Sequence, residues 1–556
     1  MAPTIRTCSL LAFAVLVSAA PVAAKRTEPE PPNRFGTFVG ARAAELTGDA
    51  RRSALLYASL AQAEPDNRTV SARAVGQAIA AGDAELALRL IKRFPMRELG
   101  VDARLLLAAD HLAGGREKQA LKVLSAEGSG FDLGFMAPLV AAWDAAERRR
   151  PTAIDLLAQV PEGSGIAPYL PEQRALILLR LRRIGEAEPF VARALATAGG
   201  RETRLRLAFA EGYRQAGDVP RAVAMLTGND VALSLARQQL ARGKPIEGAI
   251  TGPAEAFSQL LVALAVDLSR ADARSLPLAM VQVARHADPD NAEATILLGL
   301  LLAQAGRADD AVVALRRIPD TSLFISQARD TEVRALIRDG RQEEALARAQ
   351  AFASADAASA DDHARLGDVL SDMDRHVQAA QAFGRATALV EAGGPGGDLW
   401  ALHLLRGGAL EQADRWPEAK VALERARQLA PANPLVLNYL GYAKLERGEN
   451  LDKAEALIAE ASRLAPRDAS ITDSLGWAQF KRGRVDDAIA TLQRAAAADP
   501  GQAEIHEHLG DALYTSGRKF EARFAWSAAL VTAEDDVKAR IEAKVRGGLN
   551  SANAAP

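Results

Sequence analysis

The chain of 556 residues contains one cysteine, Cys8, and its aromatic residues amount to 5%. A single cysteine excludes a disulfide framework and every metal centre that needs several thiolates. The shortage of aromatic residues argues against a β-sandwich, whose strands are enriched in them. The chain also lacks an excess of charge of one sign, because 68 lysines and arginines stand against 70 aspartates and glutamates. Nucleic acid is therefore not an expected partner.

Alanine, in contrast, is abundant, and 49% of the residues are hydrophobic. Alanine is the best helix former, and its small side chain lets helices approach closely. The composition therefore predicts an all-α protein. At a typical domain size of ~150 residues the length would correspond to three or four globular domains. That estimate does not hold for an array of repeats, so internal periodicity has to be sought first.

Residues 1–24 have the three parts of a secretory signal peptide. Arg6 supplies a positive charge, residues 10–20 form an apolar stretch, and small residues follow up to a predicted cleavage after residue 24. Cys8 precedes the apolar stretch, whereas a lipidated cysteine would follow it, so lipid attachment is not expected; an uncleaved N-terminal anchor is the alternative. Residues 25–35 are predicted to be a Pro-rich spacer. No later segment has the ~20 apolar residues of a membrane-spanning helix.

A repeat begins at about residue 360. Glycine recurs at steps of 40, 34, 35 and 34 residues, an alanine follows 12 or 13 residues later, and a second alanine comes seven after the first. A bulky residue lies between the two alanines, and in three copies a proline follows the second. The positions are Gly367, Gly407, Gly441, Gly476 and Gly510; Ala379, Ala419, Ala454, Ala488 and Ala522; Phe383, Leu423, Ile458, Leu492 and Trp526; Ala386, Ala426, Ala461, Ala495 and Ala529; Pro431, Pro466 and Pro500.

This register resembles the tetratricopeptide repeat (TPR) family, most clearly in residues 469–502. The resemblance implies a right-handed α-solenoid of helix-turn-helix repeats. We expect the recurring glycine to face the first alanine where the two helices cross, since a larger side chain would push the helix axes apart. We expect Gly448, Gly483 and Gly517 to end the first helix of their repeats in the left-handed conformation that glycine tolerates.

The same pattern is less regular nearer the N-terminus. We interpret residues 36–390 as degenerate TPR-like helical repeats, within which residues 130–175 and 245–280 fit poorly. Residues 399–534 form the regular TPR array. The glycine-rich residues 393–397 interrupt the period; they are either a hinge or a tolerated surface insertion, and we favour the insertion.

Two further segments follow the array. Val537, Ile541 and Val545 recur at every fourth position, so residues 535–548 are predicted to be an amphipathic capping helix that covers the last apolar face of the solenoid. Residues 549–556 are predicted to be a disordered tail.

The sequence offers no convincing enzymatic motif. His506-Glu507-His508 looks like half of a zinc-protease motif, which requires histidines four residues apart on one helical face. Here the residue four places after His506 is Gly510, and two residues two apart do not face each other on a helix. We therefore predict no catalytic residues, no metal site, no cofactor and no enzymatic activity.

The TPR resemblance implies that the first helix of each repeat lines a concave groove. The fifth, ninth and twelfth residues of a repeat share one side of that helix. Flat apolar side chains among carboxylates suit a peptide with apolar anchors and Lys or Arg. We expect Trp477 and Tyr442 to be exposed in this groove, whereas Phe480 and Leu445 either line it or pack between repeats. The candidate partner-binding residues are Asn438, Tyr442 and Leu445; Asp473, Trp477 and Phe480; Glu507, Asp511 and Tyr514.

A signal peptide followed by a TPR array resembles the TPR adaptor proteins of Gram-negative cell envelopes. The resemblance implies a secreted, periplasmic scaffold whose partners are proteins or peptides. A peripheral location at the outer membrane is an alternative to a location free in the periplasm. Some such adaptors present substrates to C-terminal processing proteases, which raises the effective concentration of the substrate. Two alternatives remain open: a subunit of an envelope export or polysaccharide-secretion machine, and a hydrolase or enzyme-linked regulator with an unrecognised site.

Overall fold

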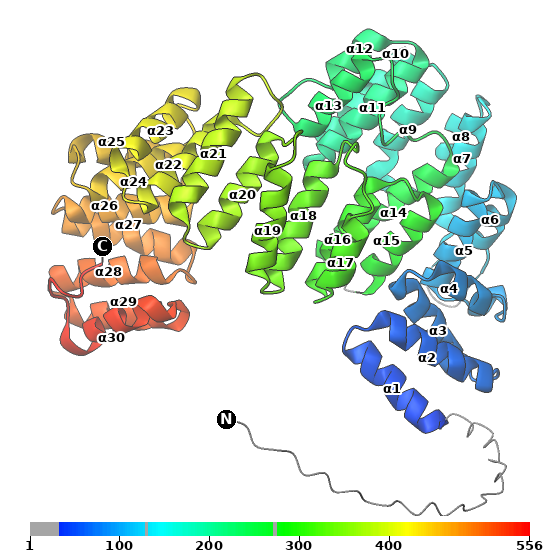
Figure 1. Cartoon of the computed structure of the whole chain (residues 1–556), viewed down its shortest axis with the longest axis horizontal. Helices are drawn as coiled ribbons and strands as arrows, with labels where there is room; N and C mark the ends of the chain where they lie inside the picture. Colours follow the sequence, from blue (N-terminus) through cyan, green and yellow to red (C-terminus); the bar gives the residue numbers. More distant parts are fainter. Residues whose placement is uncertain (1–32, 128–131, 271–274, 556) are drawn as a thin grey trace, which may run out of the picture.

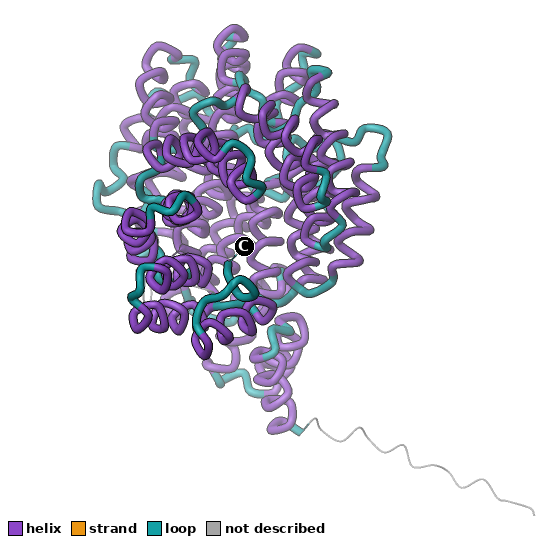
Figure 2. The backbone as a smooth tube through the Cα atoms, turned by 90° about the vertical axis from the view of Figure 1, so that its left-hand side faces the viewer, coloured by secondary structure: helices purple, strands orange, loops and turns teal. Residues whose placement is uncertain are grey.

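The computed structural model describes residues 33–127, 132–270 and 275–555. These residues form α-helices joined by turns and four short 3₁₀ segments, and no strand occurs in the described ranges (Figure 2). The prediction of an all-α solenoid built from paired helices is thereby confirmed. The predicted signal peptide, residues 1–24, and the predicted spacer up to residue 32 lie outside the described residues.

The helices follow one another as antiparallel neighbours along an arch (Figure 1). The N-terminal half contains α1 (Arg34–Leu46), α2 (Ala50–Ala63), α3 (Arg68–Ala81), α4 (Ala84–Ile91), α5 (Val101–Ala113), α6 (Glu117–Leu124), α7 (Ala137–Glu147), α8 (Ala153–Leu157), α9 (Leu170–Arg180), α10 (Ile184–Ala196), α11 (Glu202–Ala216), α12 (Val219–Met225), α13 (Val231–Ala241), α14 (Pro253–Arg270) and α15 (Ser275–Ala287). The C-terminal half contains α16 (Ala292–Gln304), α17 (Ala308–Leu315), α18 (Ile325–Arg338), α19 (Gln342–Ala353), α20 (Ala360–Asp372), α21 (His376–Glu391), α22 (Leu399–Gln412), α23 (Trp416–Leu429), α24 (Pro434–Glu446), α25 (Leu451–Leu464), α26 (Ala469–Lys481), α27 (Val485–Ala498), α28 (Ala503–Thr515), α29 (Lys519–Thr532) and α30 (Asp535–Gly547).

The recurring glycine packs most closely against the bulky residue of the second helix, and at Gly441 and Gly407 it also faces the backbone oxygen of the predicted alanine, Ala454 and Ala419. A Cβ added to Gly476 would lie 2.6 Å from Leu492 Cγ, and one added to Gly510 would lie 2.3 Å from the Trp526 ring. Each glycine therefore leaves the space that a large apolar side chain fills. The same contact recurs at Gly299–Leu315, Gly367–Phe383, Gly407–Leu423 and Gly441–Ile458.

The turns between paired helices explain a gap in the sequence pattern. Gly448, Gly483 and Gly517 have positive φ angles of 62°, 78° and 88°, as predicted. The two preceding repeats place aspartates at the equivalent turn, Asp374 and Asp414, with φ of 57° and 59°. Aspartate tolerates the left-handed region better than most residues, so these turns keep the same geometry without glycine.

The N-terminal half folds back on itself. Helices α14 and α15 pack against α3, α5 and α7, which lie far earlier in the sequence (Figure 1). His286 Nε2 lies 3.3 Å from the Asp110 carboxylate, and Arg307 Nη1 donates to the Ala80 carbonyl oxygen at 3.4 Å. All residues of α14 from Ala256 to Ala263 are buried, so its sequence shows no single apolar face. This is why residues 245–280 fit the repeat poorly.

The loop with the glycine-rich residues 393–397 does not separate two bodies, because α21 and α22 pack against each other across it. Gly396 is buried, and a Cβ there would lie 2.7 Å from both Ala360 and Val390. Gly396 therefore anchors the loop against α20 and α21. Among the described helices, none is both long enough and apolar enough to span a membrane.

The C-terminal end departs from one prediction. After α30, residues 549–555 are not a free tail: they turn back over the inner helices, and Ala555 is 7% exposed. The prediction of disorder missed that the Asn550 and Asn553 side chains hydrogen-bond to the backbone of residues 548–552.

Candidate functional site

Two adjoining cavities of about 630 and 340 Å³ run along the inner surface of the C-terminal half and share Gln412 and Tyr439. We call the space they form the trough. Its walls come mainly from the first helices of successive pairs, α18, α20, α22, α24 and α26, and its end lies at the first turn of α28. Because each first helix faces inward, residues from six repeats meet in one continuous surface.

The trough is acidic. Its lining contains seven carboxylates and three guanidinium groups, a formal net charge of −4. The chain as a whole has a net charge of only −2, so this surface concentrates negative charge. A concave wall of one sign focuses the field toward an oppositely charged ligand. The carboxylates are Asp330, Asp368, Asp372, Glu411, Glu446, Asp473 and Glu504, and the cations are Arg334, Arg365 and Arg447.

Part of this charge is neutralised within the protein. Asp330 accepts from Arg334 Nε at 2.7 Å, and Glu411 accepts from Arg447 Nη2 at 2.6 Å. Three lining carboxylates make no hydrogen bond or ion pair with any described residue, and they distribute along the whole length of the trough. They are Asp368, Asp372 and Glu504.

Asp368 shows how crowded the acidic wall is. Its side chain is reached by solvent, but the walls of the trough displace much of the water around it, and Asp330 and Asp372 add negative charge nearby. Desolvation first and like charges second raise the pKa of the Asp368 carboxyl to about 6. A cation in the trough would offset the repulsion from Asp330 and Asp372 and so lower the pKa of Asp368.

The middle of the trough offers aromatic and amide groups. Tyr439 and Tyr442 are half-buried, and burial together with neighbouring carboxylates raises the pKa of both hydroxyls, that of Tyr439 to about 12. Beside them, the Asn438 Oδ1 atom is buried and has no hydrogen-bond partner among the described residues. A buried acceptor without a donor is costly, so this atom favours a ligand that supplies an N–H group.

The structure places Trp477 differently from our expectation. Its side chain is 1% exposed, and its indole lies between the rings of His508 and Phe480, with centroid separations of 4.1 and 5.0 Å. Its Nε1 donates to Glu446 at 3.1 Å. Leu445 is 2% exposed and packs in one apolar cluster with Trp477, so of its two interpretations, packing between repeats is the correct one. Phe480 is half-buried. The prediction that Trp477 is exposed is wrong because the next repeat and the tail cover it.

Three predicted acceptors are also buried rather than open. Asp473 bonds to His508 Nδ1 at 2.9 Å, while Glu507 and Asp511 both accept from Lys544 of α30, at 2.6 and 2.7 Å. Tyr514 is half-buried within the last helix pair, where its ring centroid lies 5.5 Å from that of Trp526. Of the nine predicted residues, the trough takes only Asn438, Tyr442 and Asp473.

Residues that the sequence analysis missed lie on a neighbouring stripe of the same helices. The fifth, ninth and twelfth places were chosen, whereas the trough also uses the second, sixth and thirteenth places, as in Glu504, Tyr439 and Glu446. The second, sixth, ninth and thirteenth places are separated by four, three and four residues, so they share one face of a helix.

Tertiary structure also assembles one group that spacing within a helix could not reveal. Ligand atoms of Asp473, Glu504 and His508 lie within 4.8 Å of one another. The Asp473 carboxylate and His508 Nδ1 form a hydrogen bond. Burial by itself would lower the pKa of His508, but the negative charge of Asp473 outweighs it and the pKa is raised. The bond between Asp473 and His508 Nδ1 links α26 to α28.

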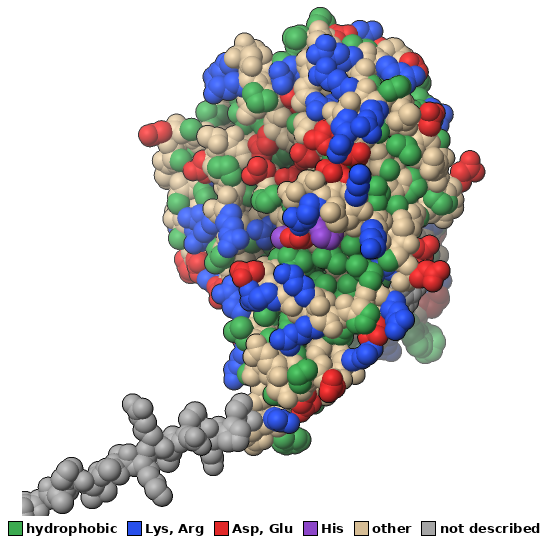
Figure 3. Space-filling model, turned by 90° about the vertical axis from the view of Figure 1, so that its right-hand side faces the viewer, with side chains coloured by type: hydrophobic (Ala, Val, Ile, Leu, Met, Phe, Trp, Pro, Cys, Tyr) green, Lys and Arg blue, Asp and Glu red, His purple; other side chains and the backbone are tan. Residues whose placement is uncertain are grey.

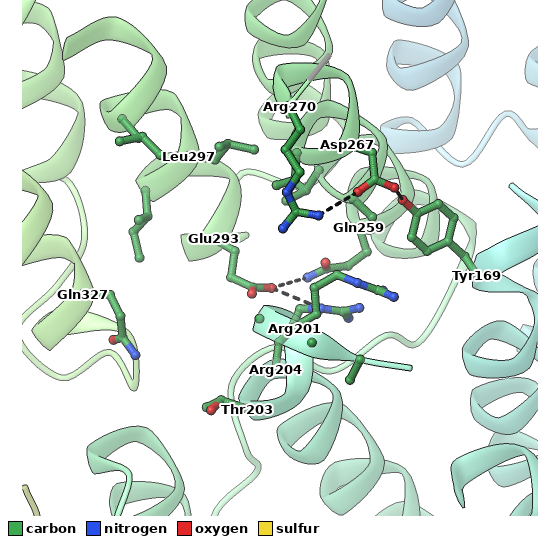
Figure 4. Close-up of a pocket in the computed structure, with 18 of the residues that line it drawn as sticks. Tyr169, Arg201, Thr203, Arg204, Gln259, Asp267, Arg270, Glu293, Leu297 and Gln327 are labelled. Atoms are coloured by element: carbon green, nitrogen blue, oxygen red, sulfur yellow. Dashed lines mark hydrogen bonds and ion pairs between the residues drawn. The ribbon is translucent and has the colours of Figure 1, made fainter. Parts of the chain in front are cut away.

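A further cavity, of about 590 Å³, lies between α11, α14 and α16 (Figure 4). Its ionic side chains point at one another: Arg270 pairs with Asp267, which accepts from Tyr169, and Glu293 lies between Gln259 and Arg204. The site therefore neutralises most of its own charge. On the outer face at this end of the molecule, acidic and basic side chains are interspersed (Figure 3).

Comparison with known families finds that residues 278–322 and 474–536 match the profile of the tetratricopeptide repeat. A search of curated proteins finds no match. Among solved structures, the APC/C hetero-tetramer Cut9-Hcn1 is 14% identical, with 93% of this chain and 97% of that chain covered and a TM-score of 0.38. Yeast Tom70 is 10% identical over 93% of this chain and 95% of its own, also with a TM-score of 0.38. A tetratricopeptide repeat protein from Parabacteroides merdae is 15% identical over 47% of this chain and 99% of its own, with a TM-score of 0.38.

Proposed function

We propose that this chain, two segments of which match the tetratricopeptide repeat, is a non-enzymatic scaffold that binds a lysine- or arginine-bearing segment of a partner protein in the trough. Proteins of this family mediate protein–protein interactions. The proposal rests on one observation above all: Asp368, Asp372 and Glu504 line a continuous concave surface and have no partner of their own among the described residues.

Other features of the trough fit the same ligand. Tyr439 and Tyr442 offer flat faces for apolar or cationic side chains, and Asn438 Oδ1 offers an acceptor for a backbone N–H. Alternating charged and aromatic contacts suit a segment laid along the trough rather than a small molecule. Paired carboxylates such as Glu411 set the shape of the wall, since they are held by Arg447.

We further propose that the scaffold works in the periplasm of a Gram-negative bacterium, where it presents substrates to a C-terminal processing protease. The signal-like residues 1–24 support export. The acidic trough would hold one partner while the long outer surface of the arch remains available for another, so a protease and its substrate could be held together. Cell fractionation followed by crosslinking and mass spectrometry of the captured partners tests this role.

Binding can be tested directly with the purified full-length protein. The probe is a fluorescent peptide of about twelve residues that alternates lysine with leucine, and the matched probe carries glutamate in place of lysine. We expect saturable binding of the lysine peptide only, and weakening by roughly threefold to tenfold when Asp368→Asn and Glu504→Gln are combined, because each exposed charge contact contributes ~0.2–1 kcal/mol. Added salt should weaken it further.

The matched control is Asp356→Asn. Asp356 is exposed in the loop after α19 and does not line the trough, so this variant should bind as the parent does. Equal affinity for the lysine and glutamate peptides, or equal weakening by Asp356→Asn, would show that the trough is not the binding surface.

A further inference from the structure

The tail formed by residues 548–555 lies on the inner surface next to the trough. Ala555 is buried in one apolar cluster with Leu445 and Trp477, and Tyr442, which lines the trough, packs against that cluster. The Ala555 amide donates to Asp511 Oδ2 at 3.1 Å. Leu445, Trp477 and Asp511 were all predicted from sequence to contact a partner, so a segment of the chain itself occupies part of the predicted groove.

The tail reaches this position through a built turn. Gly548 begins it with a φ of 82°, and a Cβ there would lie 2.3 Å from the Tyr514 hydroxyl, so only glycine fits. The Asn553 side chain is 6% exposed; its Nδ2 donates to the Gly548 carbonyl oxygen at 2.9 Å, and its Oδ1 accepts from the Asn550 amide at 2.7 Å. These bonds orient the chain so that Ala555 points into the cluster.

The contacts of the tail are few enough to be released. Ala552 and Ala554 are exposed, and Ala555 is the one alanine of the tail whose side chain is buried among residues of the array. One small apolar side chain and one hydrogen bond contribute only a few kcal/mol. Asp511 stays bonded to Lys544 and Trp526 without the tail, so release would not leave its carboxylate unpartnered.

We propose that residues 548–555 are a resident peptide in a binding site at the C-terminal end of the trough, and that a partner segment longer than the trough must displace them. The site takes a short segment with a small apolar side chain in the place of Ala555 and a backbone N–H for Asp511. Displacement by a partner segment rests on the proposed function of the trough, whereas occupancy of the site by residues 548–555 does not.

The occupancy can be tested in the full chain with Ala555→Asp. A carboxylate at this place would be buried beside Asp511 and apolar side chains, so the variant tail should leave the surface. The probe is a labelled peptide of residues 549–556. We expect it to bind the Ala555→Asp protein at least tenfold more tightly than the parent protein, whose site is occupied. Ala554→Asp is the matched control, because Ala554 is exposed, and it should behave as the parent.

Hydrogen–deuterium exchange of the parent provides a second measurement that needs no variant. The amides of Asn553 and Ala555 should exchange at least tenfold more slowly than in the free peptide. Equal exchange, or equal binding of the tail peptide to the parent and to Ala555→Asp, would overturn the resident peptide. The lysine–leucine peptide, extended to about twenty residues, then tests displacement: it should bind Ala555→Asp several-fold more tightly than Ala554→Asp. Equal affinities would overturn displacement, whereas no binding to either protein would contradict the function proposed for the trough.

Discussion

The indole of Trp526 occupies the space that a side chain at Gly510 would need. A Cβ at Gly510 would lie 2.3 Å from the ring atoms Cδ1 and Nε1, and the ring is itself fixed, because Nε1 donates to Asp511 Oδ1 at 2.9 Å. The glycine and the tryptophan are sixteen residues apart, on the two helices of one repeat. Their contact sets how closely α28 and α29 approach.

From this contact we expect Gly510→Ala to destabilise the C-terminal repeats by about 1–3 kcal/mol, since neither the ring nor the backbone can move freely. Urea unfolding followed by circular dichroism measures the change. Gly384→Ala is the control: Gly384 lies inside α21, its added Cβ would meet Arg406 only at an ordinary 3.6 Å, and alanine favours helix by ~1 kcal/mol over glycine. A loss of stability at Gly384 equal to that at Gly510 would contradict this explanation.

The buried Lys544 should hold the capping helix in place. Its side chain is fully buried, and its Nζ donates to Glu507 and Asp511. Lys544→Met would leave two buried carboxylates without this cation, so we expect a loss of about 3–5 kcal/mol. Faster hydrogen exchange in α30 would locate the loss. In Lys538→Met, which removes an exposed pair with Asp535, exchange should stay close to that of the parent.

Binding of a lysine peptide to the trough should strengthen between pH 5 and pH 7. The pKa of Asp368 is about 6 in the free protein, so the carboxyl is largely neutral at pH 5 and charged at pH 7. A cation interacts favourably only with the charged form, which predicts a rise in affinity of about threefold to fivefold over this range. Titrations of peptide binding at several pH values test this, and Asp368→Asn should remove most of the pH dependence.

Stability should change with pH in the opposite direction at His508. The Asp473 carboxylate raises the pKa of this buried histidine above its unfolded value of ~6.5, so the stabilisation is fully present below about pH 6.5 and is lost as pH rises through the higher folded pKa. The urea midpoint of the C-terminal repeats should therefore fall toward alkaline pH. We expect His508→Gln to flatten the profile and His506→Gln, in the same helix, to keep it; the same slope in both variants would exclude the pair as its cause.

The regular part of the fold was predictable from sequence because its information is local. Gly476, Leu492 and the turn at Gly483 are repeated at a constant spacing, and the helix pair they specify forms in the same way in each copy. The prediction named only the alanine as the residue opposite the glycine and missed the bulky residue, which lies closer. The alanines were chosen for their size, but a glycine is needed most where its neighbour is large.

The N-terminal half was less predictable for the opposite reason. Helix α14 contacts α5 and α7, which lie more than a hundred residues earlier, and its burial on all sides removes the amphipathic pattern that marks a repeat helix. Periodicity describes how a helix meets its neighbours in sequence, and it carries no information about a helix that returns across the array.

The sequence by itself determined the helices, their pairing and the inward-facing side of each first helix, because these follow from side-chain size and spacing within some 34 residues. Only the tertiary structure decided which inward residues remain available. Trp477, Glu507 and Asp511 are covered by the next repeat, α30 and the tail, whereas Asp368 and Glu504 stay open. The physical reason is that exposure on a concave surface depends on what the chain places opposite each residue, and those contacts join residues far apart in sequence.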